Sequence, residues 1–347
     1  MKNKKKVVVI GGGFAGSTIA RKLEGDFDVT LIDNKEYFEF TPSILRVIVE
    51  PKHLKKIQVL HKDYLKKSKI ILGEVKSINL KEVLVNKKKI PFDYLALCSG
   101  SRYSSPIKAN HAIIPSRAKT LFQASKNLEK ATKILIIGGG LVGIELAGEI
   151  CEKYPDKLIT LVHASPEILE RHNKKTRKYV INYLVNKKVQ VRTNQRIVKW
   201  SKNSYFTDKG EKIQADMAFF CTGIIPNTEY LKENTLKIPS INENKIEVNS
   251  FLQVSKYQNI FSAGDVNNIP VEKTAQNAEQ QANIIYKNIR SLEKNKPLIE
   301  YHNRKNPVVI SLGKRKGVLE YNNIVITGFI PSILKWFIEK KEMSKYK

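Results

Sequence analysis

The stretch VVVIGGGFAG at residues 7–16 returns 127 residues later as ILIIGGGLVG at residues 134–143. In each copy an apolar, largely β-branched run leads through three glycines into a helical pattern. A second apolar strand follows each helix, at residues 28–32 and 158–163. Two such β–α–β units are typical of dinucleotide-binding domains. The repeat therefore predicts an α/β protein with two doubly wound, Rossmann-like domains.

The glycines of the first copy follow the GxGxxG spacing at Gly11, Gly13 and Gly16. The first permits a tight turn, the second lets the backbone approach a pyrophosphate, and the third lets helix and strand pack closely. The second strand ends in Asp33, whose carboxylate can accept hydrogen bonds from a ribose 2′-hydroxyl. We predict a nucleotide site here. Its further contacts are Gly12, Phe14, Ala15, Asn34 and Lys35.

The second copy has the same spacing at Gly138, Gly140 and Gly143, but its second strand ends in His163. A carboxylate at this position would repel the 2′-phosphate of NADP, and its absence removes that barrier. Arg171 is the nearest cation that could favour the phosphate. A structural role for His163, as the cap of its strand, is the alternative. We predict a nicotinamide-nucleotide site, with NADH and NADPH both open. Its helical contacts are Leu141 and Val142.

Two nucleotide sites in one chain imply electron transfer between two bound cofactors, and a flavin is the natural partner of a nicotinamide. Three further strand ends carry small residues that let the chain pass close to a cofactor. Generic strand ends are the alternative explanation for each. The residues concerned are Ser99 and Gly100, Gly223, and Gly264 with Asp265.

The 347 residues include 61 lysines and arginines against 33 acidic residues, a formal charge of +28. Such a charge attracts nucleic acid, anionic lipid or acidic proteins. The lysines are spread along the whole chain, so compositional bias is the favoured explanation and the charge assigns no function. Three cysteines without a CxxC pair indicate a reducing compartment and a packing role. No metal site is predicted.

Nearly the whole chain resembles the flavoproteins with two dinucleotide-binding domains, the pyridine nucleotide–disulfide oxidoreductase superfamily, whose fold is that of glutathione reductase. The shared motifs are VVVIGGGFAG, FDYLALCSG, ILIIGGGLVGIELAGEI, FFCTGIIPN and IFSAGD. The more specific segments KEYFEFT, RVIVEP and TLVH resemble the group of apoptosis-inducing-factor homologues and ferroptosis suppressor proteins. Type II NADH:quinone dehydrogenases are more distantly similar.

The resemblance implies FAD and NAD(P)H as cofactors and a division into domains. The FAD-binding domain would comprise residues 1–108 and 246–300, and the NAD(P)H-binding domain residues 109–245. A small α+β region would occupy residues 301–347.

The resemblance also implies roles for three residues outside the glycine-rich turns. Pro42 would sit near the isoalloxazine ring of FAD. Glu145 would lie by the nicotinamide and the flavin. Lys273, at the start of a helix expected over residues 272–293, would approach the flavin pyrimidine edge, where its charge would stabilise the reduced flavin. Glu145 and Lys273 are the predicted catalytic residues.

The C-terminal tail at residues 331–347 is apolar and rich in lysine. Such a segment can lie in a membrane interface and meet anionic lipid. The alternatives are a helix packed on the body of the protein and a homodimer contact. No apolar run is long enough to span a membrane. We therefore expect a cytoplasmic protein, peripheral to the cytoplasmic face of a membrane.

Together these features predict an FAD-dependent NAD(P)H:quinone oxidoreductase, and the missing CxxC argues against a disulfide reductase. One alternative is a soluble NAD(P)H reductase of a small electron-carrier protein, whose usual acidity would suit the positive charge. Another is a nucleic-acid-binding signalling flavoprotein of the apoptosis-inducing-factor type. The lack of an aromatic-interleaved basic motif makes nucleic acid the less favoured partner.

Overall fold

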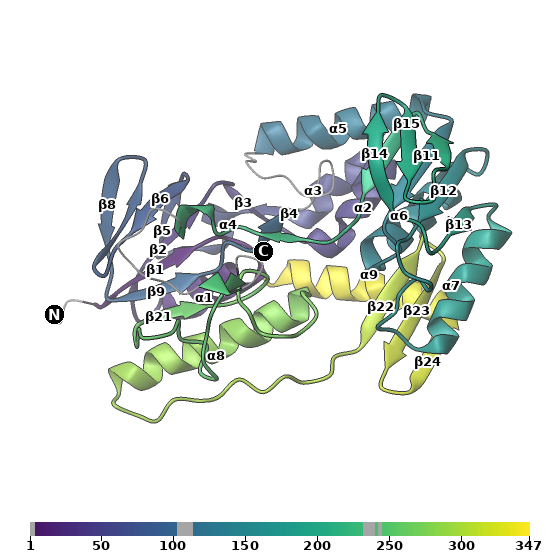
Figure 1. The fold of residues 1–347 in the computed structure, drawn as a ribbon. Coiled ribbons are helices and arrows are strands. Elements are labelled where there is room, and N and C mark those ends of the chain that lie inside the picture. Colours follow the sequence, from purple (N-terminus) through teal and green to yellow (C-terminus); the bar gives the residue numbers. More distant parts are fainter. Residues whose placement is uncertain (1–3, 103–113, 232–239, 242–244) are drawn as a thin grey trace.

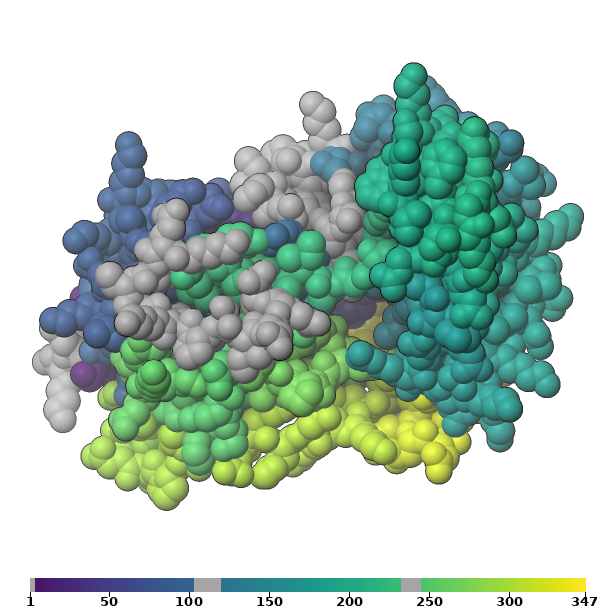
Figure 2. Space-filling view, viewed as in Figure 1, coloured from purple at the N-terminus to yellow at the C-terminus, as the bar shows by residue number. Residues whose placement is uncertain are grey.

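The protein is described by a computed structural model over residues 4–102, 114–231, 240–241 and 245–347. Figure 1 shows two lobes, each built on a parallel sheet, and a third, antiparallel sheet beside the second lobe. In Figure 2 the yellow-green segment that leads to the third sheet runs along the lower side of the molecule. The predicted fold class, two doubly wound α/β units with a small C-terminal α+β region, is confirmed.

The first lobe is built on a five-stranded parallel sheet. Its strands are β1 (Lys6–Ile10), β2 (Asp28–Asp33), β5 (Lys69–Leu72), β9 (Tyr94–Leu97) and β21 (Ile260–Ser262), and its main helices are α1 (Phe14–Leu23) and α8 (Ala275–Glu293). The strand order is β21-β9-β1-β2-β5, so β21 joins this sheet although the second lobe precedes it in the chain. Helix α1 packs on β1 and β2, and α8 packs on α1. The predicted domain boundaries stay a prediction.

The second lobe repeats this arrangement with four parallel strands. They are β11 (Lys133–Ile137), β12 (Leu158–Val162), β13 (Gln190–Arg192) and β17 (Met217–Phe220), accompanied by α5 (Ile114–Lys130), α6 (Leu141–Lys153), α7 (Lys174–Asn186) and the antiparallel β14 (Ile197–Ser201), β15 (Ser204–Thr207) and β16 (Lys212–Gln214). β11 pairs with β12 in parallel as β1 pairs with β2. The repeated sequence thus forms the same strand pair in both lobes.

Smaller elements complete the first lobe and its connection to the second. They are β3 (Tyr37–Glu39), η1 (Thr41–Ser43), α2 (Ile44–Val49), η2 (Pro51–His53), α3 (Leu54–Ile57), β4 (Gln58–Leu60), α4 (His61–Tyr64), β6 (Val75–Ile78), β7 (Glu82–Val85), β8 (Lys88–Pro91), β10 (Ser101–Arg102), β18 (Ile225–Pro226), η3 (Glu229–Leu231), β19 (Ser240–Ile241) and β20 (Lys245–Ile246). Because β10 pairs with β18, the chain leaving the second sheet returns to the first lobe at this point.

The C-terminal region links the two lobes. The antiparallel strands β22 (Val308–Leu312), β23 (Lys316–Tyr321) and β24 (Ile324–Gly328) lead into helix α9 (Phe329–Ser344), which packs on β22 and β23. Figure 1 shows α9 running from the third sheet toward the first lobe, where the chain ends. Among the described residues, no helix is both long and apolar enough to cross a membrane.

One predicted helix start was wrong. The helix expected over residues 272–293 begins at Ala275, because Thr274 is extended and its hydroxyl accepts a hydrogen bond from the backbone N–H of Asn277. Lys273 therefore lies in the loop before the helix. The predicted tail lies within and just beyond helix α9, which begins at Phe329, where the left-handed Gly328 turns the chain out of β24.

The three cysteines are free and buried. Burial raises the pKa of the Cys98 and Cys221 thiols to about 12 and that of Cys151 to about 11. A thiol with so high a pKa forms little of the reactive thiolate at neutral pH. The predicted packing role of the cysteines is confirmed.

Candidate functional site

The first glycine-rich turn lies between β1 and α1 and leaves no room for a side chain at Gly11 or Gly16. Gly11 has φ +96°, and a Cβ on it would lie 2.2 Å from the carbonyl oxygen of Cys98. A Cβ on Gly16 would lie 1.8 Å from the carbonyl oxygen of Gly11. Gly13 precedes α1 without any side-chain cap, and the space over it is open. The backbone N–H groups at this helix end are therefore presented to a phosphate, as the prediction for this turn requires.

The carboxylate of Asp33 is fixed at the end of β2. Its Oδ2 accepts a hydrogen bond from the backbone N–H of Gly12 at 2.9 Å and lies 3.1 Å from Nε2 of His61. Burial alone would raise the pKa of Asp33, but the hydrogen bond from His61 and the positive charge of Lys35 outweigh burial and lower the pKa. Asp33 is therefore ionised at neutral pH and able to accept hydrogen bonds from a ribose.

A cavity of 310 Å³ opens at the carboxyl ends of β1, β2 and β9. Its wall includes Gly11, Asp33, Asn34 and Ser99 among the predicted contacts. The volume suits a nucleoside-sized group. Together with the uncapped end of α1, the cavity fits the adenosine and pyrophosphate parts of FAD. Lining residues that the sequence did not indicate are Ile10, Ile32, Gly73, Glu74, Val75, Arg102, Asn227, Glu229 and Tyr230.

The predicted flavin contacts Gly264 and Asp265 follow β21. Gly264 has φ +86° and lies between α1 and α8, with Ala15 and Ala278 each 3.8 Å from the position of a Cβ. The Oδ2 atom of Asp265 accepts a hydrogen bond from the hydroxyl of Ser101. Gly100, which precedes Ser101, is left-handed at φ +66°. These residues form one edge of the site, where strands from distant parts of the chain end side by side.

Lys273 is held in the loop that leads from β21 to α8. Its ammonium group donates hydrogen bonds to the carbonyl oxygens of Asn267, at 2.9 Å, and Ile269, at 3.2 Å. Burial lowers the pKa of Lys273 to about 8, and the negative charge of Asp265 only partly offsets this. A half-buried cation next to Asp265 is suited to stabilising negative charge on a bound group.

The second glycine-rich turn repeats the first between β11 and α6. Gly138 has φ +115°, and a Cβ on it would lie 2.3 Å from the carbonyl oxygen of Cys221. A Cβ on Gly143 would lie 1.9 Å from the carbonyl oxygen of Gly138. Gly140 precedes α6 with no side-chain cap, and the helix opens with Leu141 and Val142. Gly223, beyond the end of β17, is exposed at the same edge of the sheet.

His163 occupies in the second lobe the place that Asp33 has in the first. Its Nδ1 accepts a hydrogen bond from the backbone N–H of Gly139 at 3.1 Å, just as Asp33 accepts from Gly12. An Nδ1 that accepts a hydrogen bond leaves the proton of the neutral ring on Nε2. His163 can therefore donate to a ribose hydroxyl or a phosphate from Nε2. The position carries no anion that would exclude NADPH.

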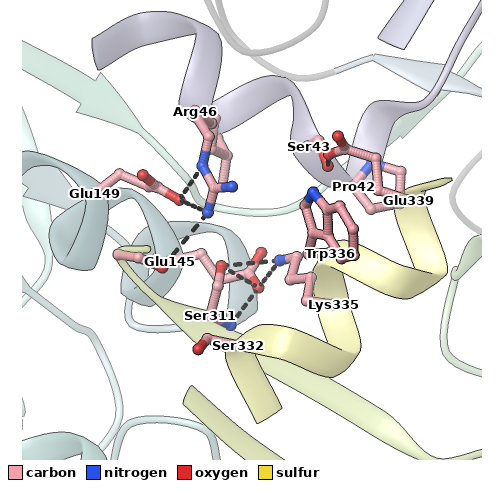
Figure 3. Close-up of a pocket in the computed structure, with 12 residues that line it drawn as sticks. Pro42, Ser43, Arg46, Glu145, Glu149, Ser311, Ser332, Lys335, Trp336 and Glu339 are labelled. Atoms are coloured by element: carbon pink, nitrogen blue, oxygen red, sulfur yellow. Dashed lines mark hydrogen bonds and ion pairs between the residues drawn. The ribbon is translucent and has the colours of Figure 1, made fainter. Parts of the chain in front are cut away.

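A small polar cavity lies where α2, α6, β22 and α9 meet (Figure 3). Glu145, the predicted catalytic residue of α6, pairs with Lys335 of α9 at 2.5 Å and accepts a hydrogen bond from the backbone N–H of Ser311 at 2.8 Å. Arg46 of α2 pairs with Glu149 of α6 at 3.0 Å. Pro42 and Glu145 both line this cavity, and their predicted places beside a flavin stay a prediction. Lys273 does not line it.

Four charged residues of this cavity were missed by sequence reasoning. Glu149 is buried and follows the partly buried Glu145 by one helical turn, and carboxylates removed from water require cations. The spacing of the two carboxylates thus indicates that cationic partners exist. It could not have identified them, because Arg46 and Lys335 come from α2 and α9, at opposite ends of the chain. Glu339 of α9 is the fourth.

Comparison with known proteins identifies the family. The model of the pyridine nucleotide-disulphide oxidoreductases matches residues 5–282. The chain belongs to this family. It is 34% identical over 364 residues to apoptosis-inducing factor homolog A of Dictyostelium discoideum, covering 96% of this chain and 89% of that protein. It is 30% identical over 329 residues to ferroptosis suppressor protein 1 of Mus musculus, covering 90% and 87%.

Solved structures share the fold at lower identity. NDH2 from Plasmodium falciparum, solved in complex with NADH, has a TM-score of 0.86 at 15% identity and covers 99% of this chain and 96% of that one. The sulfide:quinone oxidoreductase from Aquifex aeolicus has a TM-score of 0.84 at 20% identity, covering 99% and 91%. Family membership confirms the predicted enzyme class, an FAD-dependent oxidoreductase that uses NAD(P)H.

Proposed function

We propose that this oxidoreductase passes electrons from NAD(P)H through FAD to a quinone at a membrane surface. The observation that carries the proposal is the position of α9. The helix closes the polar cavity with Lys335 and, on its outer side, exposes apolar side chains. A quinone needs both surroundings, because its ring is reduced among polar groups and its tail is apolar. A quinone as the electron acceptor is supported by the sulfide:quinone oxidoreductase from Aquifex aeolicus, which shares the fold.

The exposed side of α9 is suited to lipid. Ile330 is 63% exposed, Trp336 51% and Phe337 54%. Lys340 and Lys341 are exposed beside them, and the ammonium group of Lys340 lies over the Trp336 ring. Apolar side chains flanked by lysines can enter an anionic membrane interface. A two-fold contact between copies through this face would instead bring like charges together, which favours a membrane over a homodimer here.

The residues of the two glycine-rich turns would hold the cofactors. We assign FAD to Gly11, Gly13, Asp33 and the 310 Å³ cavity, and NAD(P)H to the turn that ends at Gly143. When bound, FAD accepts the hydride of NAD(P)H and passes two electrons on. Lys273 would supply positive charge toward the flavin. Glu145 and Pro42 would face the reacting rings from the cavity in Figure 3.

The cofactor and acceptor assignments are tested on the purified protein. We expect the absorbance spectrum of bound FAD, bleaching on anaerobic addition of NADH or NADPH, and return of the colour when a short-chain quinone is added. A colourless protein that takes up no FAD would overturn the reading of both turns. Return of the colour only with an electron-carrier protein, and with no quinone, would overturn the acceptor assignment.

The membrane contact is tested by replacing exposed apolar residues of α9. We expect Ile330→Ser with Phe337→Ser to abolish sedimentation with vesicles of phosphatidylcholine and phosphatidylglycerol. Turnover of a long-tailed quinone in those vesicles should fall with it, whereas ferricyanide reduction should stay. Leu80→Ser is the matched control, because Leu80 is equally exposed, at 62%, in the first lobe. Unchanged vesicle binding in the α9 variant would contradict the membrane contact.

A further inference from the structure

Helix α9 buries a carboxylate while its aromatic side chains are exposed. Glu339 is 8% exposed, whereas Trp336 and Phe337 on the same helix are more than half exposed. On most helices the apolar side chains are buried and the carboxylates are exposed, and α9 has the reverse arrangement. A buried carboxylate is tolerated only when it is fully hydrogen-bonded. If the side chain at this position served only to anchor the helix, an apolar residue would do so as well as Glu339. The position of Glu339 therefore calls for a chemical explanation.

The contacts of Glu339 connect it to a buried histidine. Its Oε2 accepts a hydrogen bond from the hydroxyl of Ser43 and lies 3.0 Å from Nε2 of His53. Burial alone would raise the pKa of Glu339, but the hydrogen bonds from His53 and Ser43 lower it. His53 ends η2, and Glu50, just before η2, reaches the surface and pairs with Lys314 at 2.6 Å. His53 itself is only 5% exposed, so Glu50 and Lys314 are the neighbours of η2 that reach the surface.

Glu339 also lines the polar cavity that holds Glu145 and Lys335 (Figure 3). The cavity has a volume of 20 Å³, enough for one water molecule, and its polar walls offer that water several partners. Two of its carboxylates are paired with long basic side chains, Glu145 with Lys335 and Glu149 with Arg46. Glu339 is instead paired with a titratable imidazole. Among the cavity carboxylates, it is the one placed to exchange a proton.

Quinone reduction by NAD(P)H requires a proton from solvent. The overall reaction is NAD(P)H + H⁺ + quinone → NAD(P)⁺ + quinol, in which the hydride carries two electrons and one of the two protons of the quinol. We infer that His53 and Glu339 form the relay that supplies the second proton. The His53 ring takes up a solvent proton that enters from the Glu50 side of η2, its Nε2 releases a proton to Glu339, and the cavity water carries it to the quinone oxygen. This inference rests on the proposed function.

The relay is tested by comparing two acceptors. Ferricyanide takes up one electron and no proton, whereas a short-chain ubiquinone needs the proton. We expect Glu339→Gln to lower the ratio of quinone turnover to ferricyanide turnover at least about tenfold, because a positioned proton transfer is lost. The solvent deuterium isotope effect should increase for quinone turnover and stay the same for ferricyanide turnover. Glu342→Gln is the matched control, because this carboxylate of the same helix pairs with Lys345 outside the cavity.

Two further measurements separate a relay from an anchor. Glu339→Asp should restore most of the ratio, and His53→Gln should lower it as Glu339→Gln does. A crystal structure without nucleotides should contain an ordered water in hydrogen-bond distance of Glu339. Equal losses with both acceptors, an unchanged ratio, or a dry cavity would each overturn the relay. Wild-type protein that turns over ferricyanide but no quinone would overturn the proposed function, and the relay with it.

Discussion

The ring of Tyr346, the penultimate residue, stacks on Phe38 of β3 with centroids 3.9 Å apart and 13° between the ring planes. The Tyr346 side chain is fully buried, and its hydroxyl lies 3.1 Å from that of Ser17 in α1. The chain terminus is therefore part of the first lobe. Because α9 starts at the third sheet, this stack fixes the far end of the helix that closes the polar cavity.

Replacing Tyr346 should loosen the C-terminal helix. Tyr346→Ala removes a fully buried aromatic ring, so we expect the free energy of unfolding to fall by about 3–5 kcal/mol. Tyr346→Phe keeps the stack and loses only the hydroxyl contact, at a cost of about 1 kcal/mol. Urea unfolding monitored by circular dichroism measures both. Equal losses in the two variants would show that the ring stack contributes little.

His61 should act as a positioning residue for FAD. Its Nε2 contacts Asp33 and its Nδ1 lies 2.6 Å from the hydroxyl of Tyr64. His61→Ala leaves Asp33 without this partner, and we expect the Kd for FAD to rise about tenfold, which corresponds to roughly 1.4 kcal/mol. Fluorescence titration of the flavin-free protein measures the change. His302→Ala, at an exposed histidine, should leave the Kd unaltered.

The residue at position 163 should decide between the two nicotinamide cofactors. His163→Asp introduces an anion at the place that Asp33 occupies in the first lobe, where it would repel a 2′-phosphate. We expect the Kd for NADP⁺ to rise at least about tenfold and that for NAD⁺ to change less. Isothermal titration with NAD⁺ and NADP⁺ provides the measurement. An equal rise in the Kd values of both cofactors would show that His163 does not contact the adenosine ribose.

Lys273 should react at a lower pH than other lysines. Because burial lowers its pKa to about 8, half of its amine is uncharged and nucleophilic at that pH. Competitive labelling with acetic anhydride, read by mass spectrometry, should give a midpoint near pH 8 for Lys273. The exposed Lys62 in the same sample is the internal reference. Protection by added FAD would further support its place beside the flavin.

Acid should remove stabilisation contributed by two buried carboxylates. The folded protein lowers the pKa of Asp33 below 3.8 and that of Glu339 below 4.5, mainly through hydrogen bonds that outweigh desolvation. Their contribution is fully present above these unfolded-state values and is lost as the pH falls through the lower folded-state values. Urea unfolding from pH 6 to pH 3 should therefore show wild type converging on Glu339→Gln. A constant gap between the two would contradict the lowered pKa.

Much of the fold could be predicted because its signals are local. The two glycine-rich turns depend on spacing within ten residues, and steric limits at Gly11 and Gly138 explain why that spacing works. Alternation of apolar runs and helical patterns then predicts the parallel sheets. The start of α8 was predicted too early, because the capping residue Thr274, and not the apolar pattern, determines where this helix begins.

The sequence by itself determined two nucleotide-binding lobes and the absence of an acid at His163, because each follows from residues adjacent in the chain. Only the tertiary structure decided what surrounds Glu145. Its partners Lys335 and Ser311 lie 190 and 166 residues away, and Tyr346 reaches Phe38 from the other end of the chain. Such pairs have no periodic signal in the sequence, since they exist only once the packing of α9 between the lobes has brought the two ends of the chain together.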